Sequence, residues 1–149
     1  MEDAQSTFHL GKEIGMKSQG SEVIGLIGPL GAGKTVFVKG LAQGLGIADN
    51  TVSSPTFPIM NLYPGRLPLC HIDLYRLDQP LETVGLEEYL NWNGVTAIEW
   101  ADKMQINEIN MVIELHPIEE NQRTVTIRVN PDLLNLAQFS FWNPACHPL

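Results

Sequence analysis

The chain has 149 residues, of which 44% are hydrophobic, and this length and composition fit one globular domain. Its formal net charge is -8, from 17 acidic against 9 basic residues, which disfavours DNA binding and strong direct contact with tRNA. No segment approaches the roughly 20 apolar residues of a membrane span, the acidic start does not resemble a signal peptide, and the two cysteines fit no metal spacing, so we expect a reduced, cytoplasmic protein without membrane contact.

Helices and strands are predicted to alternate in the first half of the chain. Ser6 or Thr7 is expected to cap a helix that continues to about residue 17. The apolar run over 23–27 predicts a strand buried on both faces. A glycine-rich turn follows it, and the next apolar stripe predicts a helix over 34–45.

A loop rich in Ser, Thr and Pro over 50–58 precedes the remaining elements. These elements are strands over 59–63, 69–73 and 96–100, a helix over 82–91, and an antiparallel hairpin over 111–115 and 124–129. Cys70, in an apolar run, is expected to be a buried free thiol. The alternation of strands and helices predicts an α/β sheet. We divide the chain into one domain over 1–130 and a tail of uncertain structure over 131–149.

A phosphate-binding loop is predicted between the first strand and the second helix. The residues Gly28, Pro29, Leu30, Gly31, Ala32, Gly33, Lys34 and Thr35 fit the pattern G-x-x-x-x-G-K-[ST]. Glycines let the backbone N–H groups approach the phosphates. The first turn of the following helix, which includes Thr35 and Val36, favours the negative charge of the phosphates. Lys34 is expected to reach the β- and γ-phosphates, and the Thr35 hydroxyl to bind Mg²⁺.

Two acidic residues at predicted strand ends are candidates for the metal and the attacking water. Asp73 ends the strand over 69–73, which is where a P-loop protein places its second metal-binding carboxylate. Glu99 lies at the end of a later strand and could stand beside the γ-phosphate. His71 is expected on the same face as Asp73, as a packed or hydrogen-bonded structural side chain. For Arg76, a surface role and a contact with phosphate or partner both stay open.

The nucleotide is predicted to be ATP. The base-reading run Asn-Lys-x-Asp of G domains does not occur. The Asp-x-x-Gly of those proteins is also missing, because Asp73 is followed by Leu74-Tyr75-Arg76. Thr56 lies between the phosphate loop and Asp73, in a position where it could sense the γ-phosphate through magnesium or could simply belong to a proline-stiffened turn.

In combination, these motifs resemble the TsaE (YjeE) family, over about residues 7–129. The matching segments are Thr7 to Gly11, the loop Gly28 to Thr35, Ser54-Pro55-Thr56-Phe57, His71-Ile72-Asp73-Leu74-Tyr75-Arg76, Leu86 to Leu90, and Ile98-Glu99-Trp100. Pro29 departs from the family, where an acidic residue is frequent; we expect nucleotide binding to be retained. The resemblance implies a three-layer P-loop NTPase-like α/β fold with a mostly parallel sheet and antiparallel edge strands.

The resemblance also implies a function and residue roles. The family supplies an ATPase, weak alone, to the bacterial machinery that makes threonylcarbamoyladenosine in tRNA, where it would reset TsaD and TsaB proteins between rounds and meet tRNA only indirectly. It implies Lys34, Asp73, Glu99 and Thr56 as catalytic residues, with Mg²⁺ held by Thr35, Asp73 and Glu99. Further implied roles are nucleotide binding at Thr7 and Arg123, and a switch or partner surface at Ser54, Pro55, Thr56, Phe57, Tyr75, Arg76 and Trp100.

Two other function classes remain open from the residues. A small-molecule or nucleoside kinase would share the phosphate loop, but such enzymes usually carry an arginine-rich lid, and basic residues are few here. A nucleotide-gated binding module, in which ATP orders the segment around Thr56, overlaps in part with the accessory ATPase.

Overall fold

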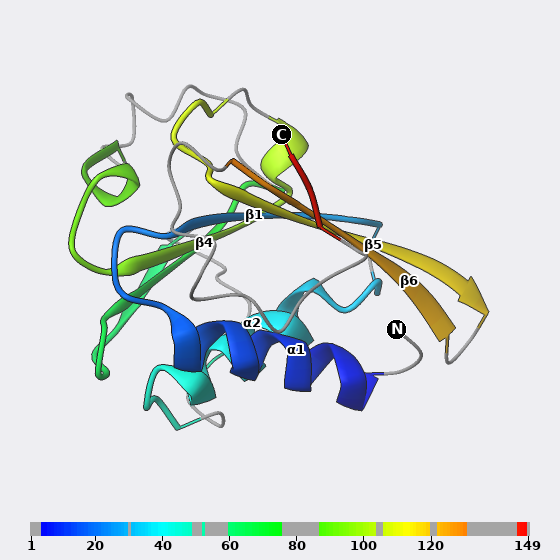
Figure 1. The fold of residues 1–149 in the computed structure, drawn as a ribbon, viewed down its shortest axis with the longest axis horizontal. Coiled ribbons are helices and arrows are strands. Elements are labelled where there is room, and N and C mark those ends of the chain that lie inside the picture. Colours follow the sequence, from blue (N-terminus) through cyan, green and yellow to red (C-terminus); the bar gives the residue numbers. More distant parts are fainter. Residues whose placement is uncertain are drawn as a thin grey trace.

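A seven-stranded sheet with the order β2-β3-β4-β1-β5-β6-β7 forms the centre of the molecule (Figure 1). The computed structural model describes residues 4–29, 31–48, 52, 60–75, 87–103, 106–119, 122–130 and 146–148. Its strands are β1 (Val23–Ile27), β2 (Met60–Tyr63), β3 (Leu69–Asp73), β4 (Val95–Glu99), β5 (Met111–Glu119), β6 (Gln122–Val129) and β7 (Cys146–Pro148). Its helices are α1 (Ala4–Lys17), α2 (Lys34–Gly44) and the 3-10 helices η2 (Glu87–Leu90) and η3 (Ala101–Lys103).

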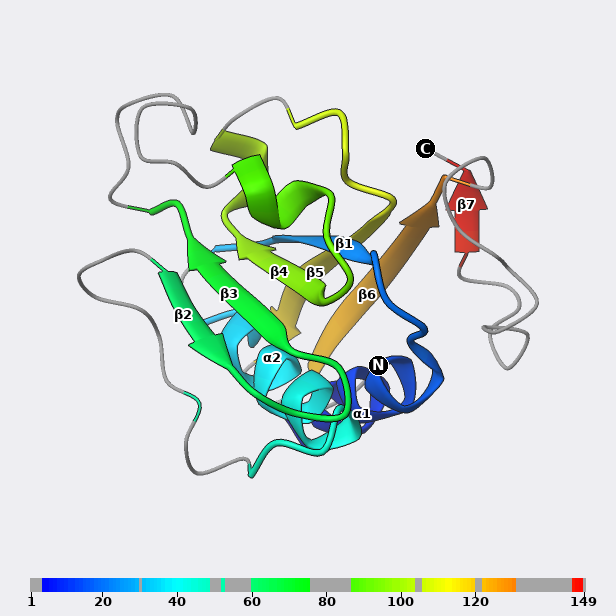
Figure 2. The same cartoon turned by 90° about the vertical axis from the view of Figure 1, so that its left-hand side faces the viewer.

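The strand pairings confirm the predicted fold class. β1 lies between β4 and β5, and β3 pairs with β4, all in parallel. β2 is antiparallel to β3, and β6 is antiparallel to β5, which also confirms the predicted hairpin. Helices α1 and α2 cover one face of the sheet, and η2 and η3 lie on the other, which gives three layers (Figure 2). None of the helices in the described ranges is long and apolar enough to cross a membrane.

One local prediction was wrong, and a second is tested only in part. The first helix begins at Ala4, so Ser6 and Thr7 lie inside it and do not cap it; Ala and Gln at its start are good helix formers. Of the predicted helix over 82–91, residues 82–86 lie outside the described residues, and Glu87–Leu90 form the 3-10 helix η2. After η2 the chain passes close to Pro68, whose carbonyl oxygen would lie only 2.7 Å from a Cβ on Gly94.

Part of the tail joins the sheet. β7 pairs in parallel with β6 at the edge, with Ile127 opposite Cys146 and Val129 opposite Pro148. Residues 131–145 lie outside the described residues, so the division of the chain at residue 130 stays a prediction.

Each face of the sheet has its own apolar core. The core beneath α1 and α2 includes Leu26, Phe37 and Leu69, and the opposite core includes Cys70 and Ile72. Successive residues of β3 therefore enter different cores, as the period of two requires. The predicted burial of Cys70 is confirmed, and this burial raises the pKa of its thiol to about 12.

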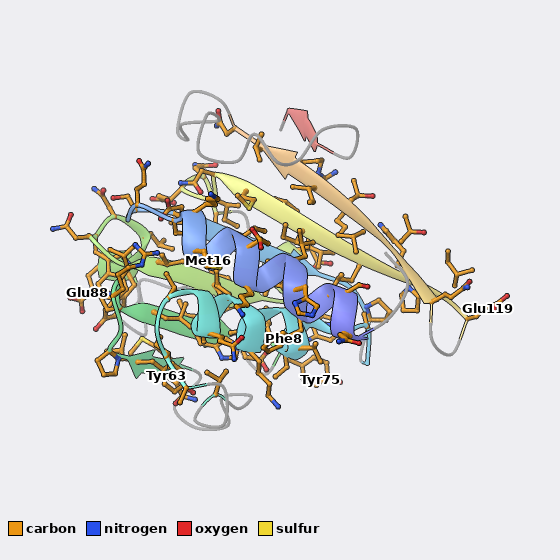
Figure 3. All side chains as sticks on the ribbon, turned by 60° about the horizontal axis from the view of Figure 1, so that its bottom comes forward. Phe8, Met16, Tyr63, Tyr75, Glu88 and Glu119 are labelled. Atoms are coloured by element: carbon orange, nitrogen blue, oxygen red, sulfur yellow. The ribbon has the colours of Figure 1, made fainter. Side chains whose placement is uncertain are left out.

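Helices α1 and α2 lie side by side (Figure 3), and glycines stand on both sides of their contact. A Cβ on Gly11 would lie 2.2 Å from the Phe37 carbonyl oxygen, and a Cβ on Gly40 would lie 1.9 Å from the Phe8 carbonyl oxygen. Because backbone atoms cannot move aside independently, larger side chains would force the helices apart. The glycines thus fix the distance of α1 from the helix that carries the phosphate loop.

Gly40→Ala is expected to lower the free energy of unfolding by about 1–3 kcal/mol, as overpacking usually does. In a helix without this contact, the same change would stabilise the protein by about 1 kcal/mol. The sign of the change in stability therefore shows whether Gly40 lies in a close contact with α1. Urea unfolding of both proteins measures the difference. The matched control is Gln43→Ala, an exposed position of the same helix that should not lose stability. An unchanged or raised stability of Gly40→Ala would contradict the close helix contact.

Candidate nucleotide site

The loop between β1 and α2 is built around glycines. Gly28 passes close to β5, where a Cβ would lie 2.8 Å from the Leu115 carbonyl oxygen. Gly31 has a φ of 77° and nothing within 4 Å of where its Cβ would stand, so the loop is open at this point. Gly33 precedes α2 with a φ of 107° and makes no side-chain cap hydrogen bond. The start of α2 therefore offers the backbone geometry that phosphate groups use.

The Lys34 side chain lies folded over this loop. Its amine donates hydrogen bonds to the carbonyl oxygens of Gly28 at 2.5 Å and Pro29 at 2.9 Å. The same amine lies 4.0 Å from the centre of the Trp100 ring. Lys34 is thus held at the loop by oxygen acceptors and by a cation–π contact.

Burial and the neighbouring charges shift the pKa of Lys34 in opposite directions. Burial lowers the pKa of its amine, while the nearby carboxylates of Glu99, Asp73 and Asp102 favour the charged form. A cationic amine beside these carboxylates is placed where a polyphosphate would need a positive partner.

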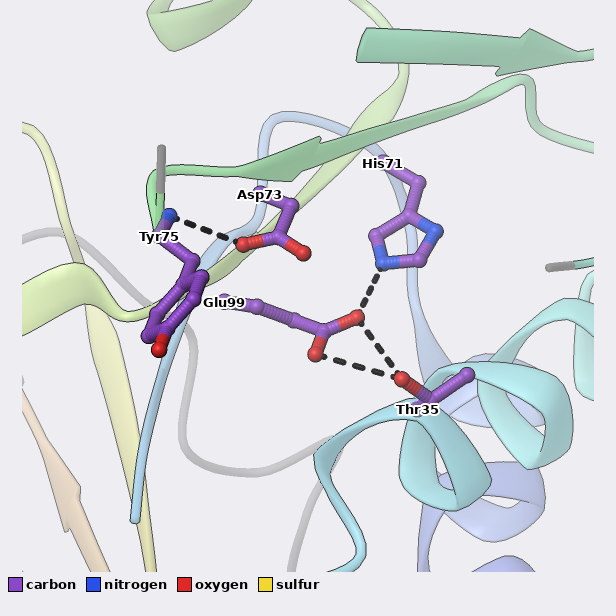
Figure 4. A network of polar contacts seen from close by, with 5 residues as sticks. All are labelled: Thr35, His71, Asp73, Tyr75 and Glu99. Carbon is purple, nitrogen blue, oxygen red and sulfur yellow. Dashed lines mark hydrogen bonds and ion pairs between the residues drawn. The ribbon is translucent and has the colours of Figure 1, made fainter. Parts of the chain in front are cut away.

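Glu99 is fixed by two residues from different elements (Figure 4). The Thr35 hydroxyl lies 3.2 Å from each carboxylate oxygen of Glu99 and can donate to either. The His71 Nε2 atom lies 2.5 Å from Glu99 Oε2. Glu99 is only 3% exposed, so its carboxylate is held in one buried position next to the start of α2.

Asp73 lies beside Glu99 at the carboxyl end of the sheet, because the two residues are register partners in β3 and β4. Its Oδ1 atom accepts a hydrogen bond of 2.9 Å from the Tyr75 backbone N–H. Burial raises the pKa of Asp73, and the charge of Glu99 raises it further. Two neighbouring carboxylates that repel each other form a place where a divalent cation lowers the electrostatic energy.

The donor set fits a triphosphate with Mg²⁺. Thr35, Asp73 and Glu99 supply oxygen donors, which this ion prefers. The described ranges hold no group of three His, Cys, Asp or Glu side chains that could bind a metal by themselves. A magnesium ion here would therefore need phosphate and water oxygens as well, as is usual in P-loop sites.

An aromatic pair borders the site. The Tyr75 and Trp100 rings are 4.9 Å apart between centroids, and Tyr75 is 46% exposed. Trp100 has a φ of 61°, which is rare for a residue other than glycine. Lys103 donates a hydrogen bond of 2.6 Å to the Tyr75 carbonyl oxygen. The ring contact and this hydrogen bond connect the segment after β4 with the end of β3, next to Lys34.

The structure brings the central predicted residues together. Lys34, Thr35, Asp73 and Glu99 converge at the start of α2, and Trp100 covers Lys34. Ala32 is buried in the loop.

The structure gives less information on the other residues predicted for the nucleotide site or the partner surface. Val36 is half-buried in the first turn of α2, and Thr7 is fully buried in α1. Arg123 pairs with Pro117 in the β5–β6 hairpin, and its side chain is not described. The predicted residues Leu30, Ser54, Pro55, Thr56, Phe57 and Arg76 lie outside the described residues.

Sequence reasoning found part of this arrangement and missed part of it. The buried hydrogen bond of His71 confirms the expected hydrogen-bonded side chain, but its partner, Glu99, was not predicted. Sequence reasoning also missed Asp102 and Lys103 in η3, whose short charged segment matches no motif.

A glycine-rich loop between the first strand and the next helix of a mostly parallel sheet, with a lysine and a threonine opening that helix, defines a P-loop protein of the α/β class. A family model described as threonylcarbamoyl adenosine biosynthesis protein TsaE matches residues 1–125. The chain belongs to the TsaE family.

Individual relatives agree with this assignment. A tRNA threonylcarbamoyladenosine biosynthesis protein TsaE from Treponema pallidum is 38% identical over 83% of this chain and 94% of its own length. The protein of the same name from Aquifex aeolicus is 39% identical over 85% of this chain and 92% of its own. The crystal structure of YdiB from Bacillus subtilis superposes with a TM-score of 0.67 and 30% identity, covering 84% of this chain and 79% of that one.

Proposed function

We propose that this chain binds ATP with Mg²⁺ and hydrolyses it slowly as an accessory protein of tRNA threonylcarbamoyladenosine biosynthesis. The observation that carries the proposal is the hydrogen-bonding contact between the Thr35 hydroxyl, at the start of α2, and the Glu99 carboxylate at the end of β4. Family membership supports the pathway, because the relatives are named for this modification.

Each side chain has a defined task in this proposal. Lys34 neutralises charge on the β- and γ-phosphates, and the loop N–H groups hold them. Thr35, Asp73 and Glu99 would hold Mg²⁺, which supplies charge stabilisation to the phosphates when bound. Glu99 also orients the attacking water, because its carboxylate is fixed next to Thr35.

We further propose that hydrolysis matters within an assembly. TsaD-like and TsaB-like proteins would be the partners and would carry the transferase chemistry, while this chain resets them between rounds. The exposed Tyr75 and its neighbour Trp100 offer an aromatic surface next to the phosphate loop, where a partner could respond to the nucleotide. The net charge of -8 favours protein partners over direct contact with tRNA.

Reconstituted tRNA modification tests the proposal. TsaD-like and TsaB-like proteins, tRNA and substrates are combined with and without this chain, and modified tRNA is counted per transferase molecule. We expect repeated turnover only when the chain and ATP are both present. Equal multiple turnover without the chain would contradict the accessory role, and transfer of labelled phosphate from ATP to a nucleoside or sugar would favour a kinase.

A further inference from the structure

His71 is a buried, strongly polar side chain that the proposed function leaves without a task. It lies in the middle of β3 and has no exposed surface. Its side chain enters the same face of the sheet as Asp73 and Glu99, toward the start of α2 (Figure 4). Burying a polar ring here has a cost that apolar residues at the same position would avoid.

The hydrogen bonds of the ring define its tautomer. Nε2 lies 2.5 Å from Glu99 Oε2, while the buried Nδ1 has no hydrogen-bond partner among the described residues. A proton on Nδ1 would be a buried donor without an acceptor, which is more costly than an unpaired ring nitrogen. The ring therefore carries its proton on Nε2, and this N–H donates a hydrogen bond to Glu99.

This hydrogen bond makes the two Glu99 oxygens different. Thr35 lies 3.2 Å from both oxygens and so does not distinguish them. His71 binds only Oε2, so the carboxylate cannot rotate about its last bond without losing a short buried contact. Oε1 is then presented in a fixed direction beside Thr35.

We propose that His71 is a positioning residue that holds Glu99 in the orientation needed for ATP turnover, an inference that rests on the proposed function. His71 itself touches neither phosphate nor the attacking water. It acts on Glu99 as outer hydrogen-bond partners act on the groups that bind metals in other sites, where their loss commonly lowers activity or metal affinity about 10- to 100-fold.

Three variants separate positioning from a structural role. His71→Leu removes the donor, and His71→Gln keeps an amide N–H that can reach Glu99. Cys70→Ala is the matched control, because it removes a fully buried side chain from the adjacent position of β3, facing the opposite core. Thermal unfolding, fluorescent-ATP affinity, and kcat and KM for ATP with the partner proteins are measured for each.

We expect His71→Leu to lower kcat about 10- to 100-fold with KM changed less than about threefold. His71→Gln should recover most of kcat, and Cys70→Ala should keep wild-type kcat even where its stability falls. Wild-type kcat in a folded His71→Leu protein would overturn the proposal. Failure of His71→Gln to exceed His71→Leu would overturn it too.

An NMR measurement on the isolated chain tests the contact without any turnover. Long-range proton–nitrogen spectra of histidine-labelled protein report which ring nitrogen carries the proton, and loss of the signal in His71→Gln assigns it. We expect His71 protonated on Nε2 and a shifted Nε2 signal in Glu99→Gln. An unprotonated Nε2, or an Nε2 signal whose chemical shift is unchanged in Glu99→Gln, would overturn the proposal.

The two proposals can therefore fail separately. If the wild-type chain hydrolyses no ATP with any partner, the proposed function fails, while the spectra still decide whether His71 holds Glu99. If turnover is present and the spectra show no Nε2 donor, only the positioning role is lost.

Discussion

Glu99→Gln is expected to bind ATP nearly as well as the wild type and to hydrolyse it at least about a hundredfold more slowly with the partner proteins present. Glutamine keeps the shape of the side chain and an oxygen that can accept the Thr35 hydrogen bond. It removes the negative charge that orients water and supports the metal. Phosphate release gives the rate, and a fluorescent-ATP titration gives the affinity.

The control for this variant is Asp102→Asn. Asp102 is a carboxylate of η3 that also favours the charged form of Lys34, but its side chain is exposed to solvent, whereas Glu99 is buried. Its turnover should stay within about threefold of the wild type, because a screened surface charge has little effect. Similar rates for Glu99→Gln and the wild type would remove Glu99 from its assigned role.

Lys34→Ala is expected to weaken ATP binding about 10- to 100-fold, since a hydrogen bond to a charged group contributes about 1.5–3 kcal/mol. The amine is already held at the loop by the Gly28 and Pro29 carbonyl oxygens, so little reorganisation is needed to meet a phosphate. A fluorescent-ATP titration measures the dissociation constant.

Lys39→Ala is the matched control, because it removes a lysine from the same helix about 1.4 turns away. Thermal unfolding of both variants shows whether they are folded. If Lys34→Ala and Lys39→Ala bound ATP equally well, the proposed role of the loop lysine would be wrong.

The parts of the fold that were predicted correctly follow from local patterns. The apolar run over 23–27 and the helical stripe over 34–45 predicted β1 and α2 nearly to the residue, because a short apolar run and a period of 3.6 are properties of neighbouring positions. Of the predicted helix over 82–91, only residues 87–91 are described, and Glu87–Leu90 form the 3-10 helix η2. An apolar pattern in the sequence does not distinguish an α-helical turn from a 3-10 turn.

The glycines of α1 and α2 show a second limit of local patterns. Within a helix, Gly11 and Gly40 look like weak points, because glycine is a poor helix former. Their value appears only when the two helices lie together and carbonyl oxygens occupy the space of a side chain.

The sequence by itself determined the phosphate loop and the two carboxylates at strand ends, because each depends on residue types at fixed local spacing. Only the tertiary structure decided how these groups meet. Thr35 and Glu99 are 64 residues apart, and His71 and Glu99 are 28 apart, so their hydrogen bonds exist because β3 and β4 are neighbours and α2 begins at the same edge of the sheet. The sheet order thus turns separate motifs into one site, and it gives His71 a partner that its position in the sequence did not reveal.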